Sequence, residues 1–289
     1  MHYKFHKVYI ELTNICGLSC TFCPTKDIKS QIMAITLYKD TLKQVSKYTK
    51  DIAFHIFGDP LTLSNLKEYL DIALKYNLNV HITTTGYYIN NFDLNIFLHK
   101  AIKQINFSLN SYNKNDMQIS IEEYLRPMFN LCDLKLKNKI HNFINFRLWN
   151  LDETDSESEF NKHIFTLLSK QFNLNLLNIN YDKPVRLENQ ILINFDNYFK
   201  WPSLSDTNST NGYCHGLISQ IGILSSGIVV PCCLDSFGVI NLGNIKTETL
   251  DDILHSQKAI NIVKGFKNNI AYEELCQKCS YKNRFIKTN

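Results

Sequence analysis

Apolar and polar positions along the first 180 residues repeat with two different periods. Strand-like apolar runs occur at 7–13, 51–57, 78–84, 104–109 and 142–149, with a weaker one near 177–181. Helical spacing of apolar residues occurs at 38–48, 65–76, 92–100, a long stretch ending at 137, and 158–172. Strands that alternate with helices are typical of βα units around a parallel sheet. The pattern therefore predicts an α/β fold with six βα units.

The remaining third of the chain follows a different pattern. Residues 183–211 are predicted to be a linker, because 204–211 is polar and rich in turn-forming residues. The aromatic segment 194–202 within it either lines a substrate cleft or docks the linker onto the first part, and we favour docking. A hairpin is expected over 219–231, turning at Ser226–Gly227, and a helix over 250–266. We place the domain boundary between 1–200 and 201–289.

Composition excludes several classes of protein. Hydrophobic residues make up 44% of the 289 positions and charged residues 20%, as in ordinary globular proteins. No apolar run approaches the ~20 residues needed to span a bilayer, and the first residues do not resemble a signal peptide. The formal net charge of +4 permits an anionic substrate, but clustered basic stripes typical of nucleic-acid binding are absent from the sequence. With nine cysteines, we expect a reducing, cytoplasmic location.

Three cysteines close together are the first candidate site. Cys16, Cys20 and Cys23 follow the first predicted strand with the spacing C-x3-C-x2-C. Iron–sulfur clusters are usually held by four thiolates, so three thiolates leave one iron open to another ligand. A structural zinc site is the alternative, although zinc favours four ligands in C-x2-C pairs. The spacing favours an iron–sulfur cluster.

With Phe22 directly before Cys23, this loop resembles the signature of the radical S-adenosylmethionine (radical SAM) superfamily. The resemblance implies a partial (βα)6 barrel and a [4Fe-4S] cluster whose open iron is chelated by SAM. It also implies reductive cleavage of SAM to a 5′-deoxyadenosyl radical, which takes a hydrogen atom from the substrate. Phe22 is then expected to pack near the adenine of SAM.

Five further cysteines follow Gly212. Cys232 lies 18 positions after Cys214 and 44 positions before Cys276, which forms a C-x2-C pair with Cys279. This arrangement resembles the auxiliary-cluster domain of many radical SAM enzymes, in its short "twitch" form and not the longer SPASM form. The resemblance implies a hairpin-plus-helix domain with one auxiliary [4Fe-4S] cluster, held by these four residues. A zinc ribbon is the alternative, because C-x2-C plus two distant cysteines also suits zinc.

Two cysteines are left over. Cys233 is adjacent to Cys232, and neighbours on a strand point to opposite faces, so both are not expected on one iron. Cys233 is either a small packing residue or a catalytic thiol that faces the active site. Cys132 lies in a helical pattern and is expected in the core.

Polar residues at the carboxyl ends of the predicted strands are candidate SAM contacts, because function in parallel α/β sheets collects there. Phe57-Gly58-Asp59-Pro60 resembles the family's Gly-Gly-Glu-Pro segment, which receives the SAM amino group. Phe57 replaces the first Gly and Asp59 the Glu, which puts the donor–acceptor pairs in doubt. A carboxylate and an exposed carbonyl suit an ammonium group. A plain turn is the alternative.

The next strands supply further candidates. Thr83-Thr84-Thr85-Gly86 resembles the family's Thr-Thr-Asn-Gly, which implies SAM contacts at Thr84 and Thr85. Ser108 and Asn110 stand where the family offers polar groups to the ribose or carboxylate of SAM. Arg147 is a candidate partner of the SAM carboxylate, because guanidinium matches carboxylate geometry. A surface position is the alternative for Arg147.

The resemblance implies a radical SAM oxidoreductase that carries out an oxidation or a crosslink on a small molecule or peptide. An external one-electron donor of the flavodoxin or ferredoxin type is the expected partner. The alternatives are a radical SAM enzyme that modifies RNA, a peptide or a protein, and a non-catalytic iron–sulfur scaffold or electron carrier. The sequence leaves the substrate and the role of the auxiliary cluster open.

Overall fold

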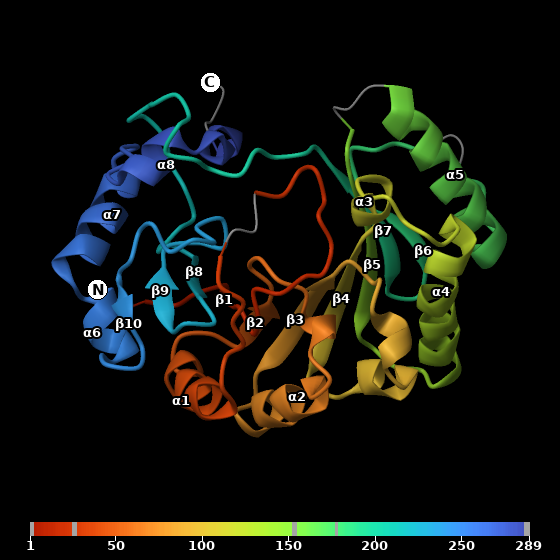
Figure 1. Ribbon diagram of the computed structural model, residues 1–289, viewed down its shortest axis with the longest axis horizontal. Helices are drawn as coiled ribbons and strands as arrows, with labels where there is room; N and C mark the ends of the chain where they lie inside the picture. Colours follow the sequence, from red (N-terminus) through yellow and green to blue (C-terminus); the bar gives the residue numbers. More distant parts are fainter. Residues whose placement is uncertain (1–2, 25–27, 152–154, 177–178, 286–289) are drawn as a thin grey trace.

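A parallel sheet curved into an open barrel forms the centre of the computed structural model, which describes residues 3–24, 28–151, 155–176 and 179–285 (Figure 1). The barrel elements are β1 (Lys7–Ile10), α1 (Ile35–Val45), β2 (Asp51–Phe54), α2 (Leu66–Lys75), β3 (Asn79–Thr84), β4 (Ile102–Ser108), α3 (Asn110–Asn113), α4 (Ile121–Lys137), β5 (Phe143–Trp149), α5 (Asp155–Phe172), β6 (Val185–Glu188) and β7 (Ile191–Asp196). The later elements are β8 (Gln220–Ile223), β9 (Ile228–Val230), β10 (Gly243–Asn244), α6 (Leu250–Leu254), α7 (Gln257–Lys267) and α8 (Glu274–Lys278).

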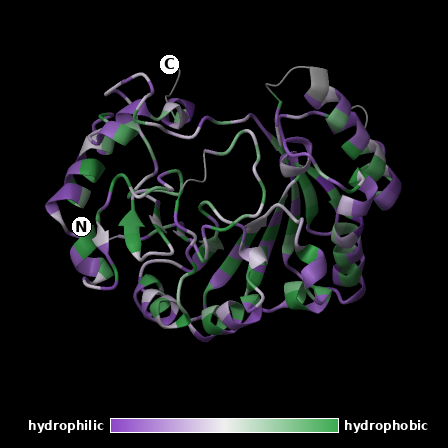
Figure 2. Ribbon diagram, viewed as in Figure 1, coloured by the Kyte–Doolittle hydropathy of each residue, from purple (hydrophilic) through white to green (hydrophobic). Residues whose placement is uncertain are grey.

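Six strands pair in parallel in the order β1-β2-β3-β4-β5-β7. The helices between them lie outside the barrel and bury their apolar sides against the strands. Hydrophobic colouring follows the strands in Figure 2, whereas hydrophilic colouring marks the outward surfaces of the helices. The predicted α/β class and partial barrel are therefore confirmed.

Helix α4 shows how the sequence sets an element boundary. Ser120 accepts a hydrogen bond from the backbone N–H of Glu123, whose side chain accepts one from the backbone N–H of Ser120. This capping box satisfies two amide groups that the first helical turn leaves without partners. Cys132 lies in the same helix and is fully buried, as predicted.

Two predicted elements of the barrel were wrong. Residues 92–100 form no α-helix: the segment contains one short 3-10 helix, Leu94–Leu98, which follows another at Ile89–Asn91. Asp93 accepts hydrogen bonds from the backbone and side chain of Asn95, and such local bonds compete with α-helix formation. The weak strand near 177–181 is also wrong where it is described, because 179–181 is not extended sheet; 177–178 lie outside the described residues.

The sixth parallel strand is β7, inside the segment predicted to be a linker. It pairs in parallel with β5 and antiparallel with β6. Its apolar alternation, Ile191 and Ile193 buried with partly exposed residues between, identifies it as a strand in hindsight. The linker begins only after Asp196.

The C-terminal hairpin of β8 and β9 is antiparallel, as predicted. It also extends the barrel sheet, because β8 pairs in parallel with β1 over Lys7↔Gln220 to Ile10↔Ile223. The predicted helix over 250–266 is two helices: α6 ends at Leu254, and the Ser256 side chain accepts a hydrogen bond from Ala259 N–H to start α7. Across the described residues, no helix is both long and apolar enough to cross a membrane.

Candidate functional site

One cavity of about 420 Å³ lies at the carboxyl ends of the barrel strands and extends to the C-terminal elements. It is lined by the thiols of both cysteine sets: Cys16, Cys20 and Cys23, together with Cys214, Cys232, Cys233, Cys276 and Cys279. The chain therefore brings the two predicted cluster sites to a common space.

The first cysteine loop follows β1 and is tightly constrained. Gly17 has φ of +73°, and an added Cβ would lie 1.8 Å from the Tyr88 hydroxyl, so only glycine fits there. Cys23 N–H donates to the Cys20 carbonyl at 3.0 Å, and Asn115 Nδ2 donates to Cys20 Sγ at 3.0 Å. All three cysteines of the loop line the cavity, and Asn115, which follows α3, supplies a hydrogen bond to one sulfur.

Gly58 and Asp59 connect this loop to the end of β2. A Cβ on Gly58 would lie 2.1 Å from the Thr13 carbonyl oxygen, so the two backbones touch. Asp59 N–H donates to the Ile15 carbonyl at 2.9 Å. The predicted segment therefore lies directly beside the first cysteine loop.

The Asp59 carboxylate is buried and holds the following loop. Its Oδ1 accepts from Leu61 N–H at 2.9 Å. Its Oδ2 accepts from Thr84 Oγ1 at 2.9 Å, and from Thr85 N–H and Oγ1 at 2.7 Å each. Burial raises the pKa of Asp59, and these hydrogen bonds oppose the rise. Asp59 therefore fixes Thr84 and Thr85 at the rim of the cavity, and its contact with SAM stays a prediction.

Replacing Asp59 with alanine is expected to lower the apparent Tm of the cluster-loaded protein by about 5–10 °C, measured by scanning calorimetry. Several buried donors lose their acceptor at once, which costs about 3 kcal/mol. The matched control is Asp93→Ala, which removes an exposed capping carboxylate. Equal shifts in the two variants would show that Asp59 does not hold this loop.

Asn110 carries an unsatisfied buried group. Its Oδ1 accepts from Trp149 N–H at 2.7 Å, which fixes the side chain, whereas its Nδ2 has no hydrogen-bond partner among the described residues. The residue is only 4% exposed and lines the cavity, as does Ser108. Buried amide donors are rarely left without a partner, so Asn110 fits an acceptor atom of a bound group.

Arg147 lines the cavity and is not a surface residue. Its guanidinium lies 4.8 Å from the Trp149 ring centroid. Burial lowers its pKa to about 10, while Tyr9, Asp196, Cys233 and Tyr281 act in the opposite direction. Arg147 thus faces the part of the cavity next to β1 and the C-terminal elements.

Aromatic residues of the linker form part of the cavity wall. Tyr198, Phe199 and Trp201 line it, and Trp201 packs edge-on against Phe57 with ring centroids 6.2 Å apart. Phe22 packs against Tyr198 at 5.3 Å. The aromatic segment therefore docks onto the barrel and lines the cavity as well, whereas the sequence favoured docking alone.

The C-terminal thiols fall into two groups. Burial, followed by the thiols of Cys214, Cys233 and Cys276, holds the pKa of Cys232 well above its ordinary value. The pKa of Cys276 is raised likewise by burial and then by Cys214 and Cys279. The four predicted ligands are therefore near enough to act on one another, and Cys233 lies in the same neighbourhood, because it also raises the pKa of Cys232. Backbone N–H groups near Cys214, Cys232, Cys233 and Cys279 oppose the rise in the pKa of each thiol.

Cys233 has a different partner. Burial raises the pKa of its thiol to about 12, and the nearby Tyr9 side chain opposes this rise. The argument from strand alternation was wrong, because β9 ends at Val230 and both cysteines lie in the bend that follows. Cys232 and Cys233 therefore differ in environment because of this bend and because Tyr9 lies beside Cys233.

The donor set fits iron–sulfur clusters. Backbone and side-chain N–H groups directed at cysteine sulfurs are the contacts that tune such clusters. The Nδ2 group of Asn110, which has no hydrogen-bond partner among the described residues, also suits a bound ligand that carries an acceptor atom. In the described part of the chain, no three His, Cys, Asp or Glu side chains come close enough together to hold a single metal ion.

Sequence reasoning missed the polar side chains of the barrel interior. Lys7, Tyr9, His55 and His81 all line the cavity. Lys7 and Tyr9 are alternate positions of β1, and His81 and Thr83 are alternate positions of β3. Polar residues at every second position of a central strand are the signal that could have found them, because such strands are normally apolar on both faces.

Two family models match the chain. The radical SAM superfamily model matches residues 10–158, just over half of the chain, and the iron–sulfur cluster-binding domain model, SPASM, matches residues 214–280. The two matched segments contain the two cysteine sets.

A curated relative is the S-adenosyl-L-methionine-dependent 2-deoxy-scyllo-inosamine dehydrogenase of Niallia circulans. It is 29% identical over 77 residues, which cover 25% of this chain and 31% of the relative. The match thus spans about a third of that protein's length.

Solved structures show the same fold along the whole chain. BtrN in complex with AdoMet and 2-DOIA has a TM-score of 0.63 at 17% identity, covering 97% of this chain and 94% of its own. SuiB of Streptococcus suis bound to S-adenosylmethionine has a TM-score of 0.60 at 13% identity, covering 99% and 75%. Native anSMEcpe with bound AdoMet has a TM-score of 0.58 at 15% identity, covering 94% and 89%. With cysteines in both matched segments and a shared cavity between them, the chain belongs to the radical SAM superfamily and carries a SPASM-type iron–sulfur cluster-binding domain.

Proposed function

We propose that this chain is a radical SAM oxidoreductase that oxidises or crosslinks a small molecule or peptide at a C–H bond. The observation that carries the proposal is the single cavity lined by both cysteine sets. A substrate in this cavity lies within reach of both cluster sites. The curated relative, whose name describes a SAM-dependent dehydrogenase, supports an oxidation.

The first cluster is assigned to Cys16, Cys20 and Cys23, with Asn115 donating to one sulfur. When bound, the cluster and SAM together supply a 5′-deoxyadenosyl radical that removes hydrogen from a C–H bond. The auxiliary cluster is assigned to Cys214, Cys232, Cys276 and Cys279. Because hydrogen bonds to cluster sulfurs change the reduction potential, the N–H groups around these thiols tune each site separately.

The SAM side of the cavity is assigned to the strand ends next to the first loop. The rim fixed by Asp59 presents Thr84 and Thr85, and Ser108 lies on the neighbouring strand. The Asn110 amide is the best supported contact, because it is buried, held in place by Trp149 N–H and lacks a partner among the described residues. Such a pre-positioned donor binds a carboxylate or ribose oxygen without paying to order its own side chain.

The aromatic wall excludes water from the reacting groups. Tyr198, Phe199 and Trp201 close one side of the cavity, with Phe22 packed against Tyr198 and assigned to the adenine. Exclusion of water protects a reactive intermediate from side reactions. The electron for each turnover comes from an external donor, which we assign to the flavodoxin or ferredoxin type.

A non-catalytic scaffold or electron carrier is less well supported. A scaffold or electron carrier needs thiols for its clusters but does not need the additional polar residues that line the cavity, such as Thr85, Ser108 and Asn110. The orphaned Asn110 amide beside the first loop therefore favours an enzyme.

The reconstituted, chemically reduced protein is expected to convert SAM to 5′-deoxyadenosine, measured by chromatography of the quenched reaction. The variant Asn110→Asp keeps the acceptor for Trp149 N–H but removes the amide donor, so it should raise the Kd for SAM at least about tenfold. Asn113→Asp is the matched control, since it makes the same change in the same short helix outside the cavity lining.

Failure of the wild-type protein to form 5′-deoxyadenosine would rule out the proposed function. Equal SAM affinities in the two variants would leave the function standing and remove Asn110 from the SAM site.

A further inference from the structure

Four basic side chains line the cavity on the side of the barrel interior. Lys7 comes from β1, His55 follows β2, His81 lies on β3 and Arg147 on β5. We call these four residues the basic floor. Basic side chains are normally taken out of water only with a partner, so the partners of these four decide what this side of the cavity can bind.

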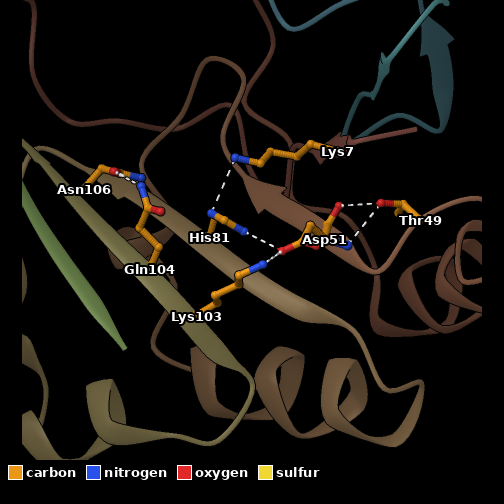
Figure 3. Close-up of polar contacts among 7 residues, drawn as sticks. All are labelled: Lys7, Thr49, Asp51, His81, Lys103, Gln104 and Asn106. Carbon is orange, nitrogen blue, oxygen red and sulfur yellow. Dashed lines mark hydrogen bonds and ion pairs between the residues drawn. The ribbon is translucent and has the colours of Figure 1, made fainter. Parts of the chain in front are cut away.

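The partners of Lys7 and His81 are known. Lys7 Nζ lies 3.4 Å from His81 Nδ1, and His81 Nε2 lies 2.8 Å from Asp51 Oδ1 (Figure 3). Lysine has only protons to donate, so His81 Nδ1 accepts and its Nε2–H donates to Asp51. His81 is then neutral, and Lys7 binds a neutral ring instead of a carboxylate.

Asp51 has its own cation outside the cavity. Lys103 Nζ donates to Asp51 Oδ1 at 2.7 Å, and the Lys103 side chain is 47% exposed. Lys103 is not among the residues that line the cavity. The carboxylate of Asp51 is therefore already shared between His81 and Lys103, as Figure 3 shows.

Arg147 also lacks a carboxylate partner in the described part of the chain. Asp196 is the carboxylate that raises the pKa of Arg147, and it already forms an ion pair with Arg284 at 3.0 Å. Arg147 instead stacks over the Trp149 ring, an arrangement that leaves its N–H groups for another partner. His55 makes an edge contact with Tyr9, with ring centroids 6.5 Å apart.

The two charged members of the basic floor, Lys7 and Arg147, repel one another. Burial lowers the pKa of Lys7, and Arg147 lowers it further. Burial lowers the pKa of His55 to about 4, with Arg147 and then Lys7 acting in the same direction. Two positive charges in one cavity cost free energy unless an anion lies near them.

The other carboxylates of the cavity do not serve this purpose. Asp59 accepts from Leu61, Thr84 and Thr85, as described above. Asp235 accepts from Val239 N–H at 2.8 Å and Ile240 N–H at 2.7 Å. Both are held by the chain's own donors, which leaves a bound anionic group as the counter-anion of the basic floor.

We infer that the basic floor binds an oxyanion group of the substrate, a phosphate, sulfate or carboxylate, and so selects an anionic substrate. This inference rests on the proposed function, since it names the class of molecule on which the radical acts. Guanidinium and ammonium groups together are the usual recognition elements for such oxyanions. An anionic group held at the floor fixes the orientation of the rest of the substrate toward the first cysteine loop.

Radiolabelled inorganic phosphate is the probe, measured by anaerobic equilibrium dialysis against the full-length, cluster-loaded protein. Saturable binding of one phosphate per chain is expected. Lys7→Met should weaken it about tenfold, because a hydrogen bond to a charged group is lost. Lys7→Arg should keep it within about threefold. The control is Lys103→Met, which also removes one lysine charge near Asp51 but lies outside the cavity. This variant should change the affinity for phosphate less than twofold. A parallel titration with acetate tells a phosphate site from a carboxylate site.

Three results would overturn the inference. One is no saturable binding of phosphate or acetate, which would mean that the basic floor only balances the charge of the clusters. Another is equal weakening by Lys7→Met and Lys103→Met. The third is displacement of phosphate by saturating SAM, which would assign Arg147 and its neighbours to the SAM carboxylate. Formation of 5′-deoxyadenosine by the same preparation reports on the proposed function separately.

Discussion

Replacement of Cys16, Cys20 and Cys23 together by alanine is expected to abolish formation of 5′-deoxyadenosine. No open iron remains for SAM without this cluster, so the loss should exceed about a thousandfold and reach the detection limit. Iron should fall from roughly eight to roughly four atoms per chain, because the other four ligands follow Gly212. Iron analysis and product chromatography on one reconstituted sample measure both quantities.

The control for this variant is Cys132→Ala, which removes a fully buried thiol of α4 that does not line the cavity. It should keep full iron content and SAM cleavage. The assignment of the first cluster would be refuted if the triple variant still produced 5′-deoxyadenosine. Wild-type iron near four atoms with zinc present would instead refute the auxiliary cluster.

Serine at position 232 and serine at position 233 are expected to have very different effects. Cys232→Ser should lose about half of the iron, because Cys232 is one of the four cysteines assigned to the auxiliary cluster. Cys233→Ser should keep it, because its side chain contacts Tyr9 and the hydroxyl can replace the thiol there. Iron content and the visible absorption of the clusters measure the difference.

Reversed iron losses would show that Cys233 is the ligand. The same pair of variants also tests the catalytic reading of Cys233. If Cys233→Ser had normal iron and normal SAM cleavage but formed no product from the true substrate, Cys233 would be a catalytic thiol. If its product yield were normal, Cys233 would be a packing residue.

The sequence was most informative where short-range patterns determine structure. The first five barrel strands were predicted within a few residues, because their apolar runs are bounded by turn residues, as in Leu78–Thr84 against the observed Asn79–Thr84. The cysteine spacing and the resemblance based on it placed both candidate cluster sites. These features depend on residues that are close together in the chain.

Features that depend on long-range pairing were not predicted. Nothing local in Gln220–Ile223 indicates that it pairs with β1, more than 200 residues earlier. The basic floor is assembled from single residues of separate strands, each unremarkable alone. His55, for example, follows an ordinary buried strand, β2, and only the curvature of the sheet brings it near Arg147 on β5.

The pairing of β8 with β1 determines how the sheet ends. Without β8, β1 would present its backbone N–H and carbonyl groups along an open edge, next to the buried side chains of Val8 and Ile10. Open apolar edges invite pairing with another chain and lead to aggregation. The segment after Gly212 therefore also protects the N-terminal strand from self-association, so a shortened chain that ends before Gln220 would be prone to precipitate even though its six barrel strands were intact.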